Sequence, residues 1–281
     1  MKTSNIDHKN SINRTTVQRA LLLIGLVLTC FGALETAFAI TPAPDGGYAG
    51  NNTAEGTDAL LSLAGGAGNT AIGFDALYSN TIGFSNTAIG TNALHSNTIA
   101  GSNTAVGDAA LLSNTTGQVN TAIGRDSLRS NTTADLNTTV GWASLYYNTT
   151  GGNNTANGAL ALLNNTTGSF NTAAGTGALS SNTTGSVNVA DGVNALLNNT
   201  SGHHNVAYGR GALSLNTTGA FNIALGDLAG DLLTTGDDNI DIGGASFGKP
   251  EKIFCICVSI TALSRSRRPN SSRCALVGSS P

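Results

Sequence analysis

Small apolar and polar side chains recur along most of the chain in a cycle of 17 residues. Residues 69–85 show the cycle clearly and read N-T-A-I-G-F-D-A-L-Y-S-N-T-I-G-F-S. The N-T-A-I string predicts a short strand, and the glycine after it permits a tight turn with a positive φ angle. A T-T-G string near the end of most units predicts a second corner. Each unit therefore predicts one turn of a coil with a strand on one side.

The cycle is kept without insertions over twelve copies. Asparagine opens every copy and glycine follows four positions later each time. A period of this regularity means that each copy stacks on the one before it. Two-helix repeats are excluded, because a helix pair with its turns needs about 34 residues. The opening asparagines are Asn52, Asn69, Asn86, Asn103, Asn120, Asn137, Asn154, Asn171, Asn188, Asn205, Asn222 and Asn239.

The pattern predicts an all-β fold, a parallel β-solenoid of about twelve 17-residue rungs. Position 8 of the unit is Ala or Ser in every copy to Ser246, and position 9 is Leu in the first ten, from Leu60 to Leu213. These side chains suit a narrow core, which agrees with an aromatic content of only 5%. The D-A-L-x-S-N stretch fits either a second strand or one short helical turn. At the ~4.8 Å strand spacing, the rungs would form a rod of roughly 55 Å.

Two columns of the repeat have predicted structural roles. Stacked first-position asparagines can donate and accept hydrogen bonds along the rod through their amides. The fifth-position glycines permit the turn after each strand. The N-x-T triplets arise from the repeat itself, so they do not predict glycosylation. The ladder is predicted at Asn69, Asn86, Asn103, Asn120, Asn137, Asn154 and Asn171, and the turns at Gly73, Gly90, Gly107, Gly124 and Gly141.

The fourth position predicts self-association. If the third-position alanine points into the coil, the fourth side chain points outward. That side chain is a branched aliphatic in most copies, and burial against an identical rod would remove such a row from water. We therefore expect a homo-oligomer. The predicted interface row is Ile72, Ile89, Val106, Ile123 and Val140, continued by Leu225 and Ile242.

The N-terminal residues differ from the repeats. Four basic residues and an apolar run from Ala20 to Cys30 precede Ala37-Phe38-Ala39, a small-x-small cleavage site. This predicts a secretory signal peptide over residues 1–39. The apolar run is shorter than the ~20 residues that span a bilayer, so no membrane-spanning segment is expected after cleavage.

Residues 40–51 are then an N-terminal linker or cap, and residues 52–248 are the repeat region. Residues 249–281 form an atypical basic tail that holds Cys255, Cys257 and Cys274. Its abrupt change of composition indicates out-of-frame translation or disorder, and a lone C-x-C is weak evidence for a metal.

The repeat region offers few groups for chemistry. It holds three arginines, no lysine and twelve carboxylates, a balance that disfavours nucleic-acid binding. No nucleophile with a base and an orienting partner can be assembled, so we expect no enzyme, no cofactor and no metal. His203 and His204 fall at a predicted corner. Asp237, Asp238 and Asp241 crowd the last full copy, where capping of the polar end is favoured over Ca²⁺ binding.

The sixth position varies most, and variation on a rigid scaffold marks where recognition would occur. Trp142 with Tyr146 and Tyr147 makes the most aromatic copy. These three residues are the candidate ligand patch, with neutral surface variation as the alternative.

The N-T-A-I-G and A-L-x-S-N-T-T-G strings resemble the head repeats of trimeric autotransporter adhesins, the YadA-like head family, and related repeats of bacterial surface and tail-fibre proteins. The resemblance covers about residues 47–248. It implies a left-handed parallel β-roll, three chains packed side by side, and binding of host matrix or other cells. No coiled-coil heptads follow the repeats, so the means of anchoring stays open.

Together these features predict an exported protein of the bacterial cell surface or extracellular space. We expect a rigid oligomeric rod that binds host, cell-surface or matrix proteins or glycans. A purely structural matrix or sheath protein is one alternative. Ice binding is another, based on the second-position threonines from Thr53 to Thr172, although Val189, Val206, Ile223 and Ile240 break that column.

Overall fold

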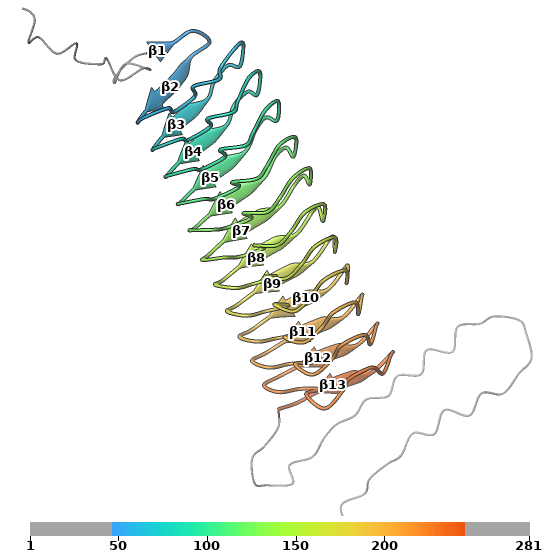
Figure 1. Cartoon of the computed structure of the whole chain (residues 1–281). Helices are drawn as coiled ribbons and strands as arrows, with labels where there is room; N and C mark the ends of the chain where they lie inside the picture. The colour runs from blue at the N-terminus through green and yellow to red at the C-terminus, as the bar shows by residue number, and fades with distance from the viewer. Residues whose placement is uncertain (1–46, 245–281) are drawn as a thin grey trace, which may run out of the picture. The chain divides into compact units, whose positions relative to one another are not determined.

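The computed structural model describes residues 47–244, in which the chain winds into a β-solenoid (Figure 1). The signal peptide, residues 40–46, all four cysteines, Ser246 and the basic tail lie outside the described residues. Rungs are numbered here from the one that begins at Asn52 to the one that begins at Asn239, and positions within a rung are counted from its asparagine.

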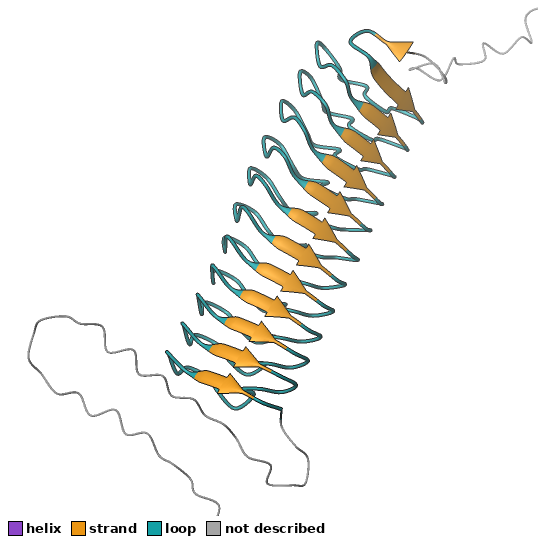
Figure 2. Ribbon diagram, turned by 180° about the vertical axis from the view of Figure 1, so that it is seen from behind, coloured by secondary structure: helices purple, strands orange, loops and turns teal. Residues whose placement is uncertain are grey.

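The strands form one 13-stranded sheet in sequence order. Strand β1 (Gly47–Tyr48) pairs antiparallel with β2 (Asn52–Glu55), and every later pair is parallel with a register of 17 residues, for example Thr70↔Thr87. Figure 2 shows the strands as a single stack along one side of the coil, with turns completing each rung. The remaining strands are β3 (Thr70–Ile72), β4 (Thr87–Ile89), β5 (Thr104–Val106), β6 (Thr121–Ile123), β7 (Thr138–Val140), β8 (Thr155–Asn157), β9 (Thr172–Ala174), β10 (Val189–Asp191), β11 (Val206–Tyr208), β12 (Ile223–Leu225) and β13 (Ile240–Ile242).

The prediction of a parallel β-solenoid with a 17-residue period is confirmed. Twelve parallel strands, β2 to β13, stack in register. The strands are short because a narrow coil leaves only about three residues between corners. Since each strand pairs with the next rung rather than folding back, all backbone pairing lies along the axis of the coil.

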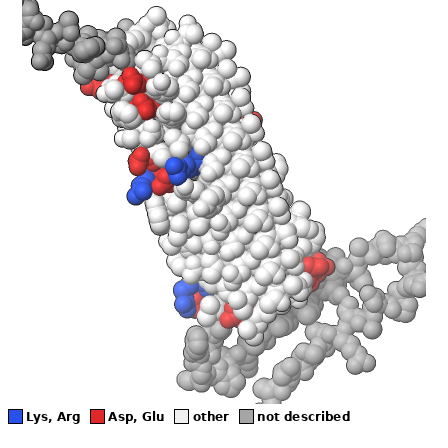
Figure 3. All heavy atoms as spheres, in the orientation of Figure 1, with Lys and Arg blue, Asp and Glu red and all other residues white. Residues whose placement is uncertain are grey.

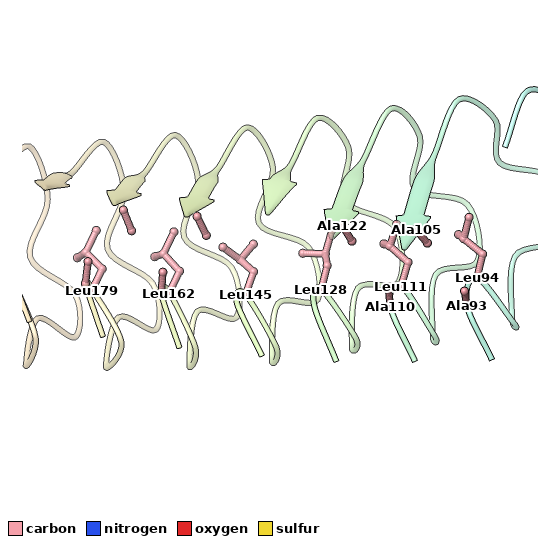
Figure 4. Close-up of a cluster of buried hydrophobic side chains, with 14 of the residues drawn as sticks. Ala93, Leu94, Ala105, Ala110, Leu111, Ala122, Leu128, Leu145, Leu162 and Leu179 are labelled. Atoms are coloured by element: carbon pink, nitrogen blue, oxygen red, sulfur yellow. The ribbon is translucent and has the colours of Figure 1, made fainter. Parts of the chain in front are cut away.

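The core is a thin stack of alanines and leucines. Position 3 of the strand and positions 8 and 9 opposite it are buried, as in Ala105, Ala110 and Leu111, each fully inaccessible to solvent. Figure 4 shows the strand alanines facing the leucine column across the coil. Burying a leucine contributes about 2 kcal/mol, so the repeated column supplies much of the apolar stabilisation.

The alternative of one short helical turn per rung is wrong, because residues 47–244 contain no helix, and the D-A-L-x-S-N stretch is a series of turns rather than a second strand. Positions 7 and 9 adopt positive φ angles, 54° at Asp75 and 52° at Leu77. The Asp75 amide donates to the carbonyl of Thr57 one rung before, and the Leu77 amide donates to Ala93 one rung after. Alternating backbone conformation thus turns peptide groups along the axis. A left-handed leucine costs about 1–2 kcal/mol, which its burial and these inter-rung bonds offset.

The two ends of the described stack depart from the repeat in the same way. Position 12 is asparagine in the rungs between, but it is Leu63 in the first rung and Leu233 in the eleventh. Both leucines pack partly buried against the core, as does Tyr48 of β1. β1 also pairs with the free edge of β2. Apolar side chains and the antiparallel strand therefore cover the core where the stack of rungs starts.

Candidate functional site

The first-position asparagines form a continuous buried column along the rod. In each rung the side-chain oxygen accepts hydrogen bonds from the backbone N–H and from the side-chain Nδ2 of the next asparagine. Asn154 donates to Asn137 Oδ1 from its backbone at 3.0 Å and from Nδ2 at 3.1 Å. Nδ2 of Asn137 also donates to the carbonyl of Gly151 at 3.0 Å. Each amide therefore joins two rungs and fixes the corner of its own rung.

A second asparagine column, at position 12, was not predicted. Asn148 Nδ2 donates to Asn131 Oδ1 and to the Gly151 carbonyl, both at 2.9 Å, and Asn165 Nδ2 donates to Asn148 Oδ1 at 2.8 Å. The same Gly151 carbonyl thus accepts from both columns. The signal was present in the sequence as the asparagine of the S-N-T-T-G string.

Threonines at position 13 form a third column beside the second. Thr149 Oγ1 donates to the carbonyl of Thr166 at 3.0 Å, and Thr166 Oγ1 donates to Thr183 at 3.0 Å. These hydroxyls supplement the backbone ladder at the corner, where the chain leaves the turn segment. Side-chain columns therefore support the rungs on both sides of the coil.

The fifth-position glycines lie at the turn after each strand with φ angles that other residues avoid. Gly141 has a φ of 136°, and a Cβ added there would lie 2.6 Å from backbone atoms of Gly158 in the next rung. Both the angle and the close approach of consecutive rungs require glycine. The same geometry holds at Gly73, Gly90, Gly107 and Gly124.

The outer face of the strands presents positions 2 and 4 as two parallel columns, which we call the strand face. Position 3 is buried, while Ile72, Ile89, Ile123 and Val140 are each about 40% exposed, and Val106 is partly exposed. The row is not continuous over the whole rod. Position 4 is occupied by Asn157, Ala174 and Asp191 in rungs 7 to 9, before Tyr208, Leu225 and Ile242 follow.

The threonines of position 2 therefore stand beside aliphatic side chains rather than beside a second row of threonines. In rungs 9 to 12 both columns are largely apolar, since Val206 and Ile223 at position 2 flank Tyr208 and Leu225 at position 4. The strand face thus has two apolar blocks, in rungs 2 to 6 and in rungs 10 to 12.

Position 17 carries a third set of outward apolar side chains, in an unfavourable backbone conformation. Val119 and Val187 have φ angles of 56° and 61°, although β-branched residues seldom adopt positive φ. Both are exposed, as are Leu136, Phe170 and Phe221 at the same position. Packing within the rod therefore does not explain these residues.

Charged side chains gather mainly along one edge of the rod, where the strands end (Figure 3). Near the middle of the rod, Arg125 Nε lies 3.8 Å from Asp108 and 3.2 Å from Asp126, and Arg129 Nε lies 3.6 Å from Asp126. Further along, Arg210 makes two hydrogen bonds to Asp227, at 2.9 and 2.8 Å. The Arg210 guanidinium holds the pKa of the Asp227 carboxyl below its ordinary value.

The candidate ligand patch lies beside the mid-rod charges. Arg129 Nη1 donates to the hydroxyl of Tyr146, and its guanidinium carbon lies 5.5 Å from the centre of that ring. Tyr146 meets Tyr147 edge to face at 4.5 Å. Trp142 and Tyr147 are about half exposed. The structure therefore adds two arginines and Asp126 to the three aromatic residues that the sequence indicated.

The remaining polar candidates have structural contacts. Asp237 Oδ1 accepts the N–H of Ala220 at 2.7 Å, and Asp241 Oδ2 accepts the N–H of Gly230 at 2.9 Å. His203 and His204 are exposed at their corner and pack against the Phe221 ring. Within residues 47–244 no group of three or more His, Cys, Asp or Glu side chains is placed to hold a metal ion.

Comparison with known proteins gave no match to a protein-family model, a curated protein or a solved structure. Among the residues that the structure describes, no helix has the length and apolar character to cross a membrane. The likeness to YadA-like head repeats rests on the repeat motifs, and function is inferred from the surface of the rod.

Proposed function

We propose that this chain is an exported rod that associates with copies of itself through the strand face and serves a structural or adhesive role at a bacterial surface. The observation that carries the proposal is the strand face itself. Its outward columns hold threonines and aliphatic side chains on a rigid scaffold, and between Ile72 and Val140 they include no charged residue. Such a surface is typical of a contact surface.

The spacing of the face favours a second copy as the partner. Its side chains repeat once per rung, at about the 4.8 Å distance between strands. A partner must have the same repeat distance to contact every rung over the five rungs from Ile72 to Val140. A second rod of the same sequence has that repeat, and its own face offers the same apolar side chains. A closed assembly such as a trimer, which the head-repeat resemblance implies, would bury the face of every copy.

Light scattering on the purified protein from the full chain tests the proposal. An oligomer is expected, and Ile123→Asp should shift it to the monomer because a carboxylate would be buried in the interface without a partner. Thr150→Asp is the matched control, since Thr150 is exposed at position 14 and lies off the strand face. A monomeric wild-type protein, or an Ile123→Asp variant that assembles like the control, would refute self-association through this face.

The adhesive and the purely structural roles separate in a second experiment. An adhesive rod should retain isolated matrix proteins or glycans on a surface, whereas a sheath protein should form lateral assemblies without them. Binding of the oligomer to immobilised ligands, measured beside electron microscopy of the protein alone, distinguishes the two outcomes.

A further inference from the structure

Seven residues in rungs 4 to 6 interrupt the uniform surface of the rod; we call them the mid-rod patch. They occupy positions 6, 7, 10 and 11, where rungs 7 and 8 hold mostly small or aliphatic residues such as Ala159, Leu163, Thr176 and Ser180. The only tryptophan of the chain is among them. The patch consists of Asp108, Arg125, Asp126, Arg129, Trp142, Tyr146 and Tyr147.

The patch is held together by contacts across three rungs. Asp126 lies between the two arginines, with Oδ2 3.2 Å from Arg125 Nε and Oδ1 3.6 Å from Arg129 Nε. Arg129 then donates to the Tyr146 hydroxyl in the next rung. Because both arginines are oriented by neighbouring side chains on a rigid backbone, little side-chain entropy is lost when a ligand binds.

Trp142 extends the patch along the rod from Arg125. The two residues occupy position 6 of adjacent rungs, and the backbone N–H of Ala143 donates to the Arg125 carbonyl at 3.0 Å. Consecutive rungs lie about 4.8 Å apart, so the indole and the guanidinium side chain start side by side. Trp142 is 53% exposed and the Arg125 side chain 69% exposed. The patch therefore offers an aromatic surface next to free hydrogen-bond donors.

The charges of the patch balance. Two guanidinium groups face two carboxylates, while the rest of the repeat region holds one arginine and ten carboxylates. An anionic glycan or a nucleic acid would meet no net positive charge in the patch and an acidic rod around it, so both are disfavoured. A globular protein partner usually covers 20–30 residues on each side, far more than this patch.

We propose that the mid-rod patch binds a neutral oligosaccharide. A pyranose ring has an apolar face of C–H groups that packs on an aromatic ring, and a rim of hydroxyls that both donate and accept hydrogen bonds. Trp142 and Tyr147 provide the apolar surface. Carboxylates of Asp108 and Asp126 accept from hydroxyls, and Arg125 donates to them. The inference rests on the proposed surface function, because it supplies the adhesive form of that function with a ligand class.

The test uses the purified protein from the full chain, with cellohexaose and mannohexaose as neutral probes and oligogalacturonate as the anionic probe. Trp142 is the only fluorophore of its kind in the chain, so a change in its emission on titration reports on the patch itself. Calorimetry gives the affinity independently. A neutral probe is expected to shift the emission and to bind, with no binding of the anionic probe.

Variants locate the site. Tyr147→Ala should weaken binding about tenfold, the loss of about 1.4 kcal/mol that marks an important aromatic contact, and Trp142→Ala should do at least the same by calorimetry. Phe74→Ala is the matched control, because Phe74 is also a position-6 aromatic and is 51% exposed outside the patch; it should leave affinity unchanged.

The proposal is overturned if neither neutral probe binds, if only the anionic probe binds, or if Phe74→Ala weakens binding as much as the patch variants. Light scattering on the same samples keeps this result separate from self-association. Loss of neutral binding in an intact oligomer refutes the saccharide site alone, whereas a monomer that still binds refutes the assembly and leaves the saccharide site standing.

Discussion

Asn137→Ala removes one amide from the middle of the buried position-1 column and should cost about 3–5 kcal/mol of stability. Four hydrogen bonds are lost: two accepted from Asn154, one donated to Asn120 Oδ1 and one donated to the Gly151 carbonyl. The backbone N–H of Asn154 is left buried without a partner, which alone costs about 1–3 kcal/mol. The other three groups keep a second partner, so each adds a smaller loss.

Asn148→Ala in the second column gives an internal comparison. It removes three hydrogen bonds, to Asn131, Gly151 and Asn165, so its cost should be lower by about 1 kcal/mol. Thr150→Ala is the control, since its exposed side chain lies off both columns, and it should change stability by less than about 0.5 kcal/mol.

Urea denaturation followed by far-UV circular dichroism measures these differences. A solenoid behaves as an array of units coupled to their neighbours, so a defect in a central rung should also broaden or split the transition. A cost for Asn137→Ala of about 1 kcal/mol or less would refute the reasoning, because it would show that neither the orphaned amide nor the column is important. An equal cost for all three variants would refute it as well.

Three further outcomes follow from the backbone and the charges. Gly141→Ala should prevent folding or cost more than about 3 kcal/mol, because the added Cβ would meet the next rung at 2.6 Å, whereas Gly65→Ala has room and should be tolerated in the same urea assay. Val187→Asn should raise the unfolding free energy of the monomer by about 1 kcal/mol, since asparagine tolerates the φ of 61° better than valine does; a loss of stability in thermal melts would contradict this. The hydrogen bonds from Arg210 lower the pKa of the Asp227 carboxyl, so the small stabilisation from this pair is present above the ordinary value of 3.8 and is lost as pH falls through the lower folded value. NMR titration of that carboxyl should show the pKa rising in Arg210→Ala, and an unchanged pKa would exclude the pairing.

The sequence was sufficient for the solenoid because the period is carried by residues with strict steric roles. Gly141 and its equivalents cannot be replaced without a clash between rungs, and Ala105 and Leu111 fit only a narrow core. Strand alternation then placed Ile123 outward, which the burial pattern of β6 bears out.

The turn segment was harder to predict, because its leucines occupy a conformation that leucine rarely adopts alone. Leu77 has a φ of 52°, and local propensity would place it in a helix or a strand. Bonds to the rungs on either side override that propensity, and such bonds exist only in the stack. Position 7 did hold a signal, since Asp, Asn or Gly occupies it in seven of the eleven complete rungs, and these residues tolerate positive φ.

The candidate site was predictable only in part. Trp142, Tyr146 and Tyr147 were identified as an aromatic copy of the repeat. The arginines that complete the patch belong to the preceding rung, 17 and 18 residues before Trp142 and Tyr147 at Arg125 and Arg129. Their contacts depend on side-chain conformations that spacing does not determine, and the ligand depends on the charge balance of the assembled patch.

Because every rung meets its neighbours in the same 17-residue register, the gene can change the length of the rod without redesigning its contacts. Loss of residues 120–136 would bring the rung of Asn103 against that of Asn137, and each asparagine, leucine and glycine would meet an equivalent partner. A single-residue deletion in a strand would instead turn the outward side chains of that rung inward. Unequal recombination between copies would therefore yield folded rods that differ in steps of about 4.8 Å, so reach can evolve separately from the surface that makes contact.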